Sequence, residues 1–196
     1  MEQLGFFTIL FAAVFTNNIL LTNYLGMCSF LGCSREIRTA LGLGTAVCLV
    51  SAATSALNWL VYAYLLAPFG LDYLRFIVFI VVIAAFVQLV EMIIERVSEP
   101  LYNALGIFLP LITVNCAILG AALFMVIRKY VFWQSVAFGF GAGVGWALAI
   151  ILMAGLQQKL RYAKVPRPFQ GVAIIMIITG VMAMAFLGFA GMVRIQ

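Results

Sequence analysis

Long uncharged apolar stretches alternate along the chain with short segments that carry most of its charges. A helix that crosses a bilayer needs about 20 mostly apolar residues, and the third stretch reaches that length if its helix continues past Glu91 to Ile94. The pattern therefore predicts six membrane-spanning helices, with loops near residues 35–38, 67–75, 96–101, 128–133 and 157–170. The uncharged stretches are residues 4–34, 39–71, 76–90, 100–127, 130–158 and 168–193.

The composition excludes a water-soluble globule. Of the 196 residues, 66% are hydrophobic and 9% are charged, whereas about a quarter of the residues in a soluble domain are charged. A disordered chain is excluded as well, because such chains are polar. We therefore expect an all-α polytopic membrane protein without a separate soluble domain.

The basic residues predict how the chain is oriented in the membrane. The net charge is +5, but the basic residues lie mostly in short loops, which is typical of topology signals beside anionic lipid and not of nucleic-acid binding. One membrane face carries seven of them and the other four, so the first face is predicted to be cytoplasmic and both termini to be outside. The first group is Arg35, Arg38, Arg96, Lys159, Arg161, Lys164 and Arg167, and the second is Arg75, Arg128, Lys129 and Arg194.

Two short motifs recur in the same order in the two halves of the chain. Cys28–Gly32 and Cys116–Gly120 both read Cys-x-x-Leu-Gly, and Ala40–Gly44 matches Ala137–Gly141 as Ala-x-Gly-x-Gly. Three spans in each half would give the halves opposite orientations. We therefore interpret residues 1–98 and 99–196 as a 3+3 inverted-topology repeat within one integral membrane domain.

The first and fourth spans contain residues that are unfavourable in a lipid-facing helix. Asn17, Asn18 and Asn23 lie in the first span, and each needs a polar partner in hydrocarbon. In the fourth span, Pro110 has no N–H and clashes with the preceding turn, so it predicts a bend or break near the middle of the membrane. Because unwound backbone at that depth is tolerated inside protein or beside a water-filled cavity, we expect two broken helices that meet near the bilayer centre.

Four cysteines are present and histidine is absent. Cys28 and Cys116 occupy equivalent positions in the two halves, which fits either two small packing residues or a pair of metal ligands. Two thiolates are too few for a four-cysteine iron–sulfur site, so a second copy or a similar partner chain would have to supply two more. Cys33 and Cys48 have no counterpart in the other half, and we interpret both as packing residues.

Two further features have competing interpretations. Glu91 shares a helix face with Gln88, and a carboxylate inside a span is a candidate for an ion path. Glu91 would instead lie at headgroup level if its span ends there, because Glu95 and Arg96 follow it closely. The glycines at 139, 141, 143 and 145 form two overlapping Gly-x-x-x-Gly spacings, which predict close helix packing and not a phosphate loop.

Residues Leu101–Gly120 resemble the signature segment of one family. This family comprises the A-type subunits of Rnf complexes and the E-type subunits of the sodium-translocating NADH:quinone oxidoreductase. Leu25–Cys28, Phe138–Gly141 and Met182–Phe186 are also similar to it, and the resemblance covers essentially the whole chain.

Choosing between the two branches of the family depends on shorter segments. Thr16–Asn18, Tyr73–Arg75, Pro168–Gly171 and the short loop at 67–75 favour the Rnf branch. Gly139–Gly143 with Trp146, and Met182–Phe186, favour the other branch. We therefore take the Rnf branch as the first expectation and the quinone-reductase branch as the alternative.

The resemblance implies six transmembrane helices with an inverted repeat, paired with a homologous six-helix sister subunit in a multi-subunit complex of the prokaryotic inner membrane. It implies one [2Fe–2S] cluster held by two cysteines from each of the two chains, here Cys28 and Cys116. It also implies a complex that passes electrons between reduced ferredoxin and NAD and couples this transfer to Na⁺ or H⁺ translocation. The chain would be one component of that translocase and not an enzyme by itself.

The surroundings of these cysteines give further candidates. We expect Gly26, Asn115 and Gly120 to surround the cluster. For the ion path the candidates are Asn17, Asn18, Asn23, Thr113 and Glu91. Two other functions stay open: a secondary transporter, which also uses inverted repeats with broken helices, and a purely structural assembly component.

Overall fold

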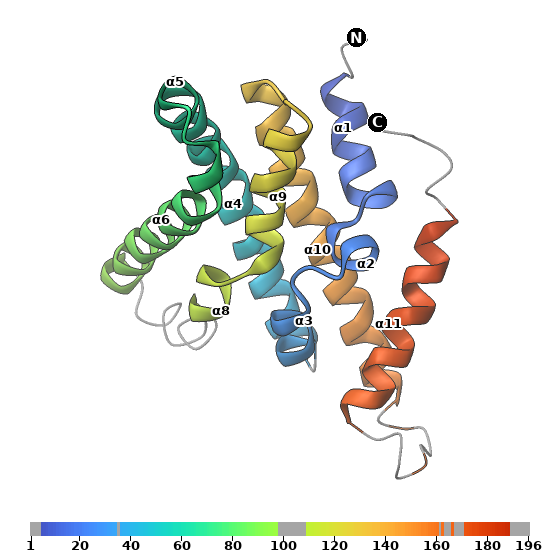
Figure 1. Cartoon of the computed structure of the whole chain (residues 1–196). Helices are drawn as coiled ribbons and strands as arrows, with labels where there is room; N and C mark the ends of the chain where they lie inside the picture. The colour runs from blue at the N-terminus through green and yellow to red at the C-terminus, as the bar shows by residue number, and fades with distance from the viewer. Residues whose placement is uncertain are drawn as a thin grey trace.

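The computed structural model describes residues 5–34, 36–97, 109–160 and 171–188, together with Tyr162 and Pro166. Within these residues the regular elements are all helices (Figure 1). The segments long and apolar enough to cross a membrane are Ile37–Phe69, Asp72–Ile93, Pro110–Ile127 and Phe132–Leu160, and Phe6–Thr16 and Val172–Leu187 are shorter apolar helices. The all-α, polytopic membrane fold expected from the sequence is confirmed, whereas the division into repeats at 1–98 and 99–196 stays a prediction.

The helices follow the predicted spans in chain order. The first span is interrupted and consists of α1 (Phe6–Phe11), a π-helical turn η1 (Ala12–Thr16), α2 (Ile19–Asn23) and α3 (Met27–Cys33). The second consists of α4 (Ile37–Val61), η2 (Tyr62–Leu66) and α5 (Ala67–Phe69), and the third of η3 (Asp72–Leu74) and α6 (Arg75–Val97). The remaining spans are α8 (Leu109–Thr113) with α9 (Cys116–Ile127), then α10 (Phe132–Leu160), and α11 (Val172–Leu187).

Left-handed backbone ends two of the spans where loops were predicted. Gly70 has φ 63° at the end of α5, a conformation that glycine adopts without steric cost. Lys129, with φ 52°, turns the chain between α9 and α10. Four cations expected in loops lie at helix ends instead: Arg38 is in the first turn of α4, Arg75 begins α6, Arg96 is in the last turn of α6, and Lys159 is in the last turn of α10.

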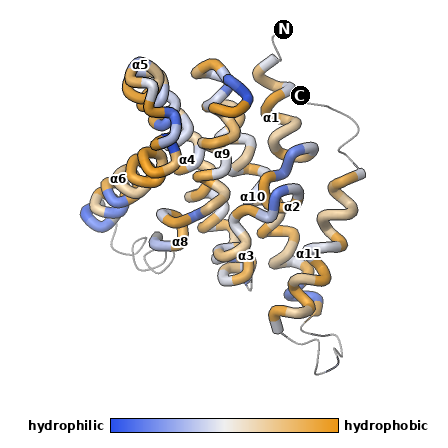
Figure 2. Tube along the Cα trace, viewed as in Figure 1, coloured by the Kyte–Doolittle hydropathy of each residue, from blue (hydrophilic) through white to orange (hydrophobic). Residues whose placement is uncertain are grey.

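The ends of the helices lie on two opposite sides of the molecule. The start of α1, the end of α11, α5 and the turn between α9 and α10 share the upper side in Figure 1, and α3 and the start of α11 lie on the lower side. Hydrophilic positions occur at helix ends and at the breaks of the first span (Figure 2). Which side is cytoplasmic stays a prediction. Five of the basic residues on which this prediction rests lie outside the described residues: Arg35, Arg161, Lys164, Arg167 and Arg194.

The glycines of α10 form the centre of the fold. A Cβ on Gly143 would lie 2.8 Å from Cys48 Cα, and a Cβ on Gly44 would lie 3.0 Å from Ala147 Cβ. These contacts run in opposite directions along the two helices, so α4 and α10 pack antiparallel. The predicted role of the glycine spacing in close helix packing is confirmed.

The opposite face of α10 packs against the first span. A Cβ on Gly141 would lie 2.9 Å from Ala13 Cβ, and one on Gly145 would lie 3.0 Å from the carbonyl oxygen of Val14. As a result 67% of an 18-residue apolar stretch of α10 is buried, whereas 17% of the corresponding stretch in Asp72–Ile93 is buried. Helix α10 is therefore the central helix that holds α4 on one side and the interrupted first span on the other.

Candidate cysteine site at the broken helices

The first interruption of the first span is built by Asn17 and Asn18. Asn17 ends η1 with φ −114° and ψ 51°, and Asn18 caps α2, its Oδ1 accepting from the N–H groups of Leu20 (3.1 Å) and Leu21 (3.4 Å). Asn18 Nδ2 donates to the Gly145 carbonyl oxygen at 2.7 Å and to a carbonyl of the preceding turn at 3.2 Å. The carboxamide of Asn18 is thus fully engaged in holding the break against α10.

The second interruption lies just before α3. Tyr24 has φ 54° and Gly26 has φ 87°, so the chain passes twice through the left-handed region before α3 begins at Met27. A Cβ on Gly26 would lie 2.5 Å from Trp146 Nε1 and 3.1 Å from Ala117 Cβ. Glycine is required here both for its backbone conformation and for the close approach of Trp146.

The fourth span is also broken. Helix α8, which contains Pro110, ends at Thr113. Asn115 then has extended backbone and accepts the Ala117 N–H at 3.0 Å to cap α9. The predicted break in this span is confirmed. Residues 101–108 lie outside the described residues.

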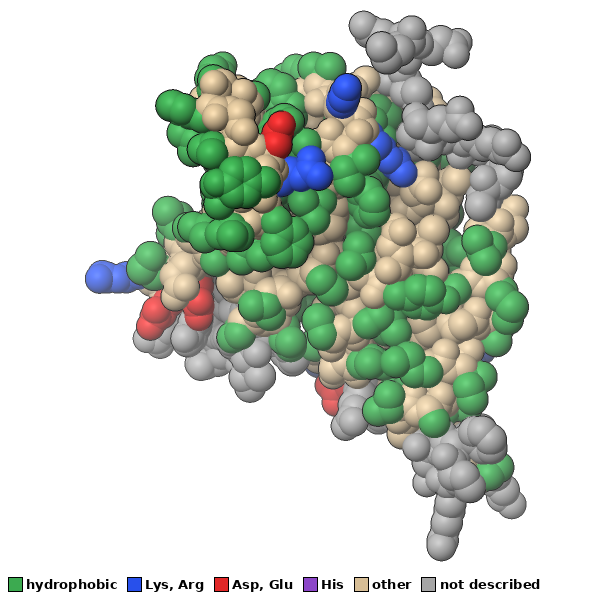
Figure 3. Space-filling view, viewed as in Figure 1, with side chains coloured by type: hydrophobic (Ala, Val, Ile, Leu, Met, Phe, Trp, Pro, Cys, Tyr) green, Lys and Arg blue, Asp and Glu red, His purple; other side chains and the backbone are tan. Residues whose placement is uncertain are grey.

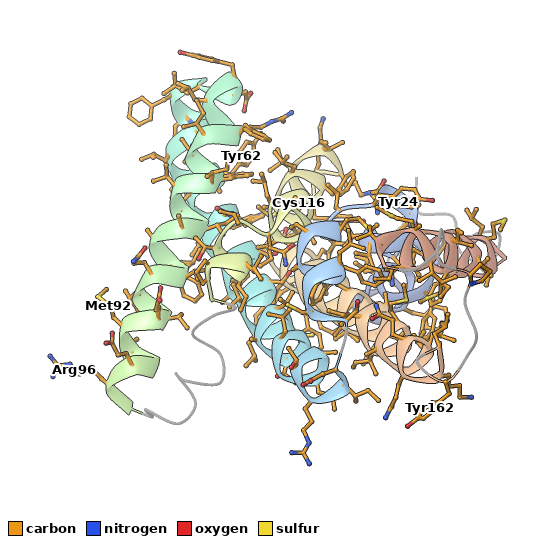
Figure 4. The ribbon with its side chains drawn as sticks, turned by 90° about the horizontal axis from the view of Figure 1, so that it is seen from below. Tyr24, Tyr62, Met92, Arg96, Cys116 and Tyr162 are labelled. Atoms are coloured by element: carbon orange, nitrogen blue, oxygen red, sulfur yellow. The ribbon has the colours of Figure 1, made fainter. Side chains whose placement is uncertain are left out.

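The two broken spans meet at a cysteine. The backbone N–H of Gly26 donates to Cys116 Sγ at 2.8 Å, so the loop before α3 contacts the first residue of α9 (Figure 4). Cys28 follows Gly26 by two residues and is exposed, whereas Cys116 is half-buried. The expectation that the broken helices meet is confirmed, and the role of Cys28 and Cys116 as ligands stays a prediction.

Buried N–H donors surround this contact. Trp146 Nε1 and Asn115 Nδ2 have no hydrogen-bond partner among the described residues, although Trp146 is 0% and Asn115 2% exposed. Leaving a buried donor unpaired costs about 1–3 kcal/mol. Cys116 is also the first residue of the 12-residue helix α9. The site is therefore rich in donors and suited to an anionic sulfur group.

The composition of the site fits half of a shared iron–sulfur centre. In the part of the chain that the structure describes, no three His, Cys, Asp or Glu side chains are close enough together to hold a metal ion. Two cysteines per chain would complete a four-cysteine site only with two more from a partner. The exposure of Cys28 leaves it accessible to such a partner, and the unpaired donors beside Cys116 suit the sulfurs of a cluster.

The other cysteines lie in packing positions. Cys33 is 2% exposed and belongs to the hydrophobic core, although it is within electrostatic range of Cys28. Cys48 packs its backbone against Gly143 of α10. These positions agree with the interpretation of both as packing residues.

Gly120 and Trp146 complete the surroundings of the cysteine site. A Cβ on Gly120 would lie 2.6 Å from Leu25 Cδ1 and 3.4 Å from Ile19 Cδ1, so Gly120 gives space to the loop that carries Gly26. Sequence reasoning assigns no role at the site to Trp146, because nothing in the spacing of residues 26 and 146 indicates that they touch. The sequence signal for a role of Trp146 is its position directly after the four glycines at 139, 141, 143 and 145.

Four of the five ion-path candidates lie at the breaks. Asn17 and Asn18 lie between η1 and α2, Asn23 is exposed at the end of α2, and Thr113 is the half-buried last residue of α8. Glu91 is half-buried in α6, close to the end of the apolar segment Asp72–Ile93. This position agrees with the headgroup-level alternative for Glu91. The path itself stays a prediction.

Comparison with known proteins gives one family for the whole chain. Residues 6–193 match the family described as "Rnf-Nqr subunit, membrane protein". The A-type subunit of the ion-translocating oxidoreductase complex of Syntrophotalea carbinolica is 50% identical, over 94% of this chain and 96% of its own length. The E-type subunits of the Na⁺-translocating NADH-quinone reductase are 48% identical in Chlamydia pneumoniae (96% of this chain, 78% of that protein) and in Rhodopirellula baltica (95% and 97%).

Proposed function

The chain belongs to the Rnf-Nqr family, whose matched members are subunits of ion-translocating oxidoreductase complexes, and we propose that within such a complex it relays electrons through the middle of the membrane. The complex would be of the Rnf type, exchanging electrons between ferredoxin and NAD. The E-type subunit of the Na⁺-translocating NADH-quinone reductase is the alternative, since relatives of both kinds match at nearly equal identity. The chain would lie in a prokaryotic inner membrane with both termini outside.

The observation that carries this proposal is the contact between the two broken spans at Cys116. Cys28 and Cys116 would provide two of the four thiolate ligands of a [2Fe–2S] cluster. Such a cluster supplies one-electron chemistry when bound. The Gly26 N–H donates to Cys116 Sγ, an unpaired Nδ2 belongs to the adjacent Asn115, and the unpaired Trp146 Nε1 lies against Gly26. Donors to the sulfurs stabilise the more negative, reduced state and so set the potential.

The other two ligands would come from a homologous sister subunit. The exposed position of Cys28 and the exposed apolar side chains Tyr24 and Val114 beside the breaks, 54% and 72% exposed, suit burial against a second six-helix chain. Other components of the complex would supply the soluble electron donor and acceptor sites.

Substitution of each cysteine tests the proposal. In the complex purified with its sister subunit, Cys28→Ser or Cys116→Ser should abolish or strongly perturb the electron paramagnetic resonance signal of the reduced cluster and lower the bound iron. Cys33→Ser and Cys48→Ser are matched controls and should leave both unchanged.

Two results would contradict the proposal. Unchanged iron and an unchanged spectrum in the Cys116→Ser complex would exclude Cys116 as a ligand. A colourless, iron-free wild-type preparation would favour a secondary transporter, and intact electron transfer in both cysteine variants would favour a structural assembly component.

We further propose that electron transfer is coupled to the movement of Na⁺ or H⁺ at the breaks. The polar groups there are Asn17, Asn23, Thr113 and Asn115, with Asn18 bound into the fold and Glu91 more distant. Carbonyl and carboxamide oxygens suit a hard cation such as Na⁺.

A further inference from the structure

A pocket of about 800 Å³ lies on the side of the molecule that carries α5 and the α9–α10 turn, away from the cysteine site. Its aromatic lining consists of Trp59, Tyr62, Tyr73 and Tyr130. Figure 4 shows Tyr62 in the space between the α5–α6 arm and α9. The pocket is thus formed by segments that are distant in the sequence.

The walls of the pocket are held in place by hydrogen bonds. Trp59 Nε1 donates to the carbonyl oxygen of Tyr130 at 3.0 Å, which fixes the turn after α9 against α4. The Tyr130 N–H in turn donates to the Met125 carbonyl oxygen at 3.0 Å. On the other side, the left-handed Gly70 directs the chain into η3 and α6. The pocket is therefore formed before any ligand enters.

The charged groups of the pocket favour an anion. Arg75 and Lys129 line it, with Asp72 as the acidic residue of the lining, and the Tyr62 hydroxyl faces that carboxylate. The nearby Arg128 is engaged elsewhere, with Tyr130 Oη at 3.2 Å and the rings of Phe124 and Phe138 within 6 Å of its guanidinium. Figure 3 shows the basic side chains gathered around an acidic one on this part of the surface. Arg75 and Lys129 are thus the cations available to a ligand.

The depth of the pocket favours a lipid over a free anion. The apolar segments Ile37–Phe69 and Pro110–Ile127 end at the pocket and Asp72–Ile93 begins there, so it lies where hydrocarbon gives way to headgroups, the level that tyrosine and tryptophan prefer. Val126 and Ile127 form part of its wall. Ile127 is 59% exposed, so this wall presents an apolar side chain to the surrounding lipid.

We propose that this pocket binds the headgroup of an anionic phospholipid. Arg75 and Lys129 contact the phosphate, the aromatic residues enclose the glycerol region, and the acyl chains lie along the apolar end of α9. The cationic pocket and the adjoining apolar surface match the two parts of a phospholipid, whereas a free phosphate would use the cations alone.

The experiment measures lipid retention by the assembled complex. The complex is placed in nanodiscs of phosphatidylcholine with a minor fraction of phosphatidylglycerol, extracted mildly, and its bound lipids are counted by native mass spectrometry. The wild type should retain phosphatidylglycerol above its share in the nanodisc. The double variant Arg75→Gln/Lys129→Gln should lower this retention about tenfold. The matched control, Arg38→Gln/Lys159→Gln, removes two exposed cations from the opposite side and should change nothing.

Three outcomes would overturn the proposal. Equal phosphatidylglycerol retention in the double variant and the wild type would exclude these cations as the binding groups. Loss of another protein component from the double variant with lipid retention unchanged would assign the pocket to a protein partner. Inorganic phosphate that displaces the lipid at equal concentration would show that the acyl chains take no part. If the double variant fails to assemble, Lys129→Asn, which tolerates the left-handed backbone, should give a smaller loss in the same direction.

Discussion

Trp146 packs its indole Nε1 against Gly26, two residues before Cys28. It is fully buried, and no hydrogen-bond acceptor for this N–H lies among the described residues. The same holds for the side-chain N–H₂ of Asn115 beside Cys116. Because buried donors in native proteins nearly always find partners, these two groups indicate an acceptor at the site, and cluster or cysteine sulfur fits that requirement.

Replacing this donor should change the potential of the site. In Trp146→Phe the ring volume is largely kept and the N–H is lost, so the proposed cluster would lose a donor that stabilises its reduced state. Its midpoint potential should become more negative by about 40 mV, for about 1 kcal/mol of hydrogen-bond energy in a one-electron couple. The measurement is a redox titration of the paramagnetic signal in the purified complex.

Trp133→Phe is the matched control for this substitution. Trp133 is on the same helix and 70% exposed, so its replacement should leave the potential unchanged. An equal shift in both variants, or no shift in Trp146→Phe, would mean that the indole N–H does not contact the redox centre.

At the scale of single residues, the sequence identifies Cys28, Cys116, Gly26 and Asn115 but assigns no role to Trp146. The first four lie next to each other in two short motifs, so their proximity could be predicted from the repeat. The contact of Trp146 with Gly26 depends on how α10 crosses the first span, which is a tertiary property with no local signal. Asn18 illustrates the same limit, because its bond to the Gly145 carbonyl makes it a structural cap as well as a candidate for ion contact.

The helices form where uncharged apolar stretches predict them, and their interruptions follow capping and glycine geometry. The spans could be predicted because length and charge determine which segments can cross a bilayer. Pro110 predicts a break in the fourth span, and the structure shows one between α8 and α9, where Asn115 caps α9. The capping role of Asn115 depends on the backbone conformation that it adopts, which the sequence alone does not give.

The loop between α2 and α3 should be the most sensitive backbone segment. In Gly26→Ala the new Cβ would meet the Trp146 ring, and the residue would have to adopt φ 87°. The left-handed backbone costs about 1–2 kcal/mol and overpacking about 1–3 kcal/mol more. We expect the thermal midpoint of the purified complex to fall by roughly 5–15 °C, with altered cluster spectra.

Gly32→Ala is the control, because nothing lies within 4 Å of a Cβ at Gly32. That variant should melt within about a degree or two of the wild type. Equal midpoints for the two variants would mean that the loop at Gly26 adapts freely, and the tight contact with Trp146 would then have no energetic weight.

For the molecule as a whole, the broken spans lie against the central helix and the exposed apolar surfaces lie at its periphery. The contact between Gly26 and Cys116 connects the first and second halves of the chain at the level of the breaks. The inverted repeat, which stays a prediction, would account for such a contact. The sequence could not predict its atoms, because short motif matches give the order of elements and not their crossing geometry.

The proposed coupling between electrons and ions belongs to this scale, since it would link the cysteine site to both sides of the membrane. An electron added at the site attracts a cation strongly, because charges are weakly screened where the dielectric constant is low. Asn23 is exposed beside the break, and Asn115 caps α9 through its Oδ1 next to Cys116. The carboxamide oxygen is the atom of each side chain that would contact a passing cation. We expect Asn23→Leu and Asn115→Leu to slow ion uptake more than electron transfer, with both rates measured in the same vesicles.

Only variants whose cluster spectrum is intact are compared. This condition is essential for Asn115→Leu, because the substitution also removes the N-cap of α9. Thr45→Val is the control, because Thr45 is an exposed residue of α4 whose hydroxyl donates to the nearby Gly42 carbonyl oxygen. This variant should leave the number of ions per electron unchanged. A lowered ratio in Asn23→Leu with normal electron transfer would locate the ion path at the break of the first span. An unchanged ratio in both asparagine variants would assign these residues to packing or to support of the cluster, and the ion would then cross elsewhere in the complex.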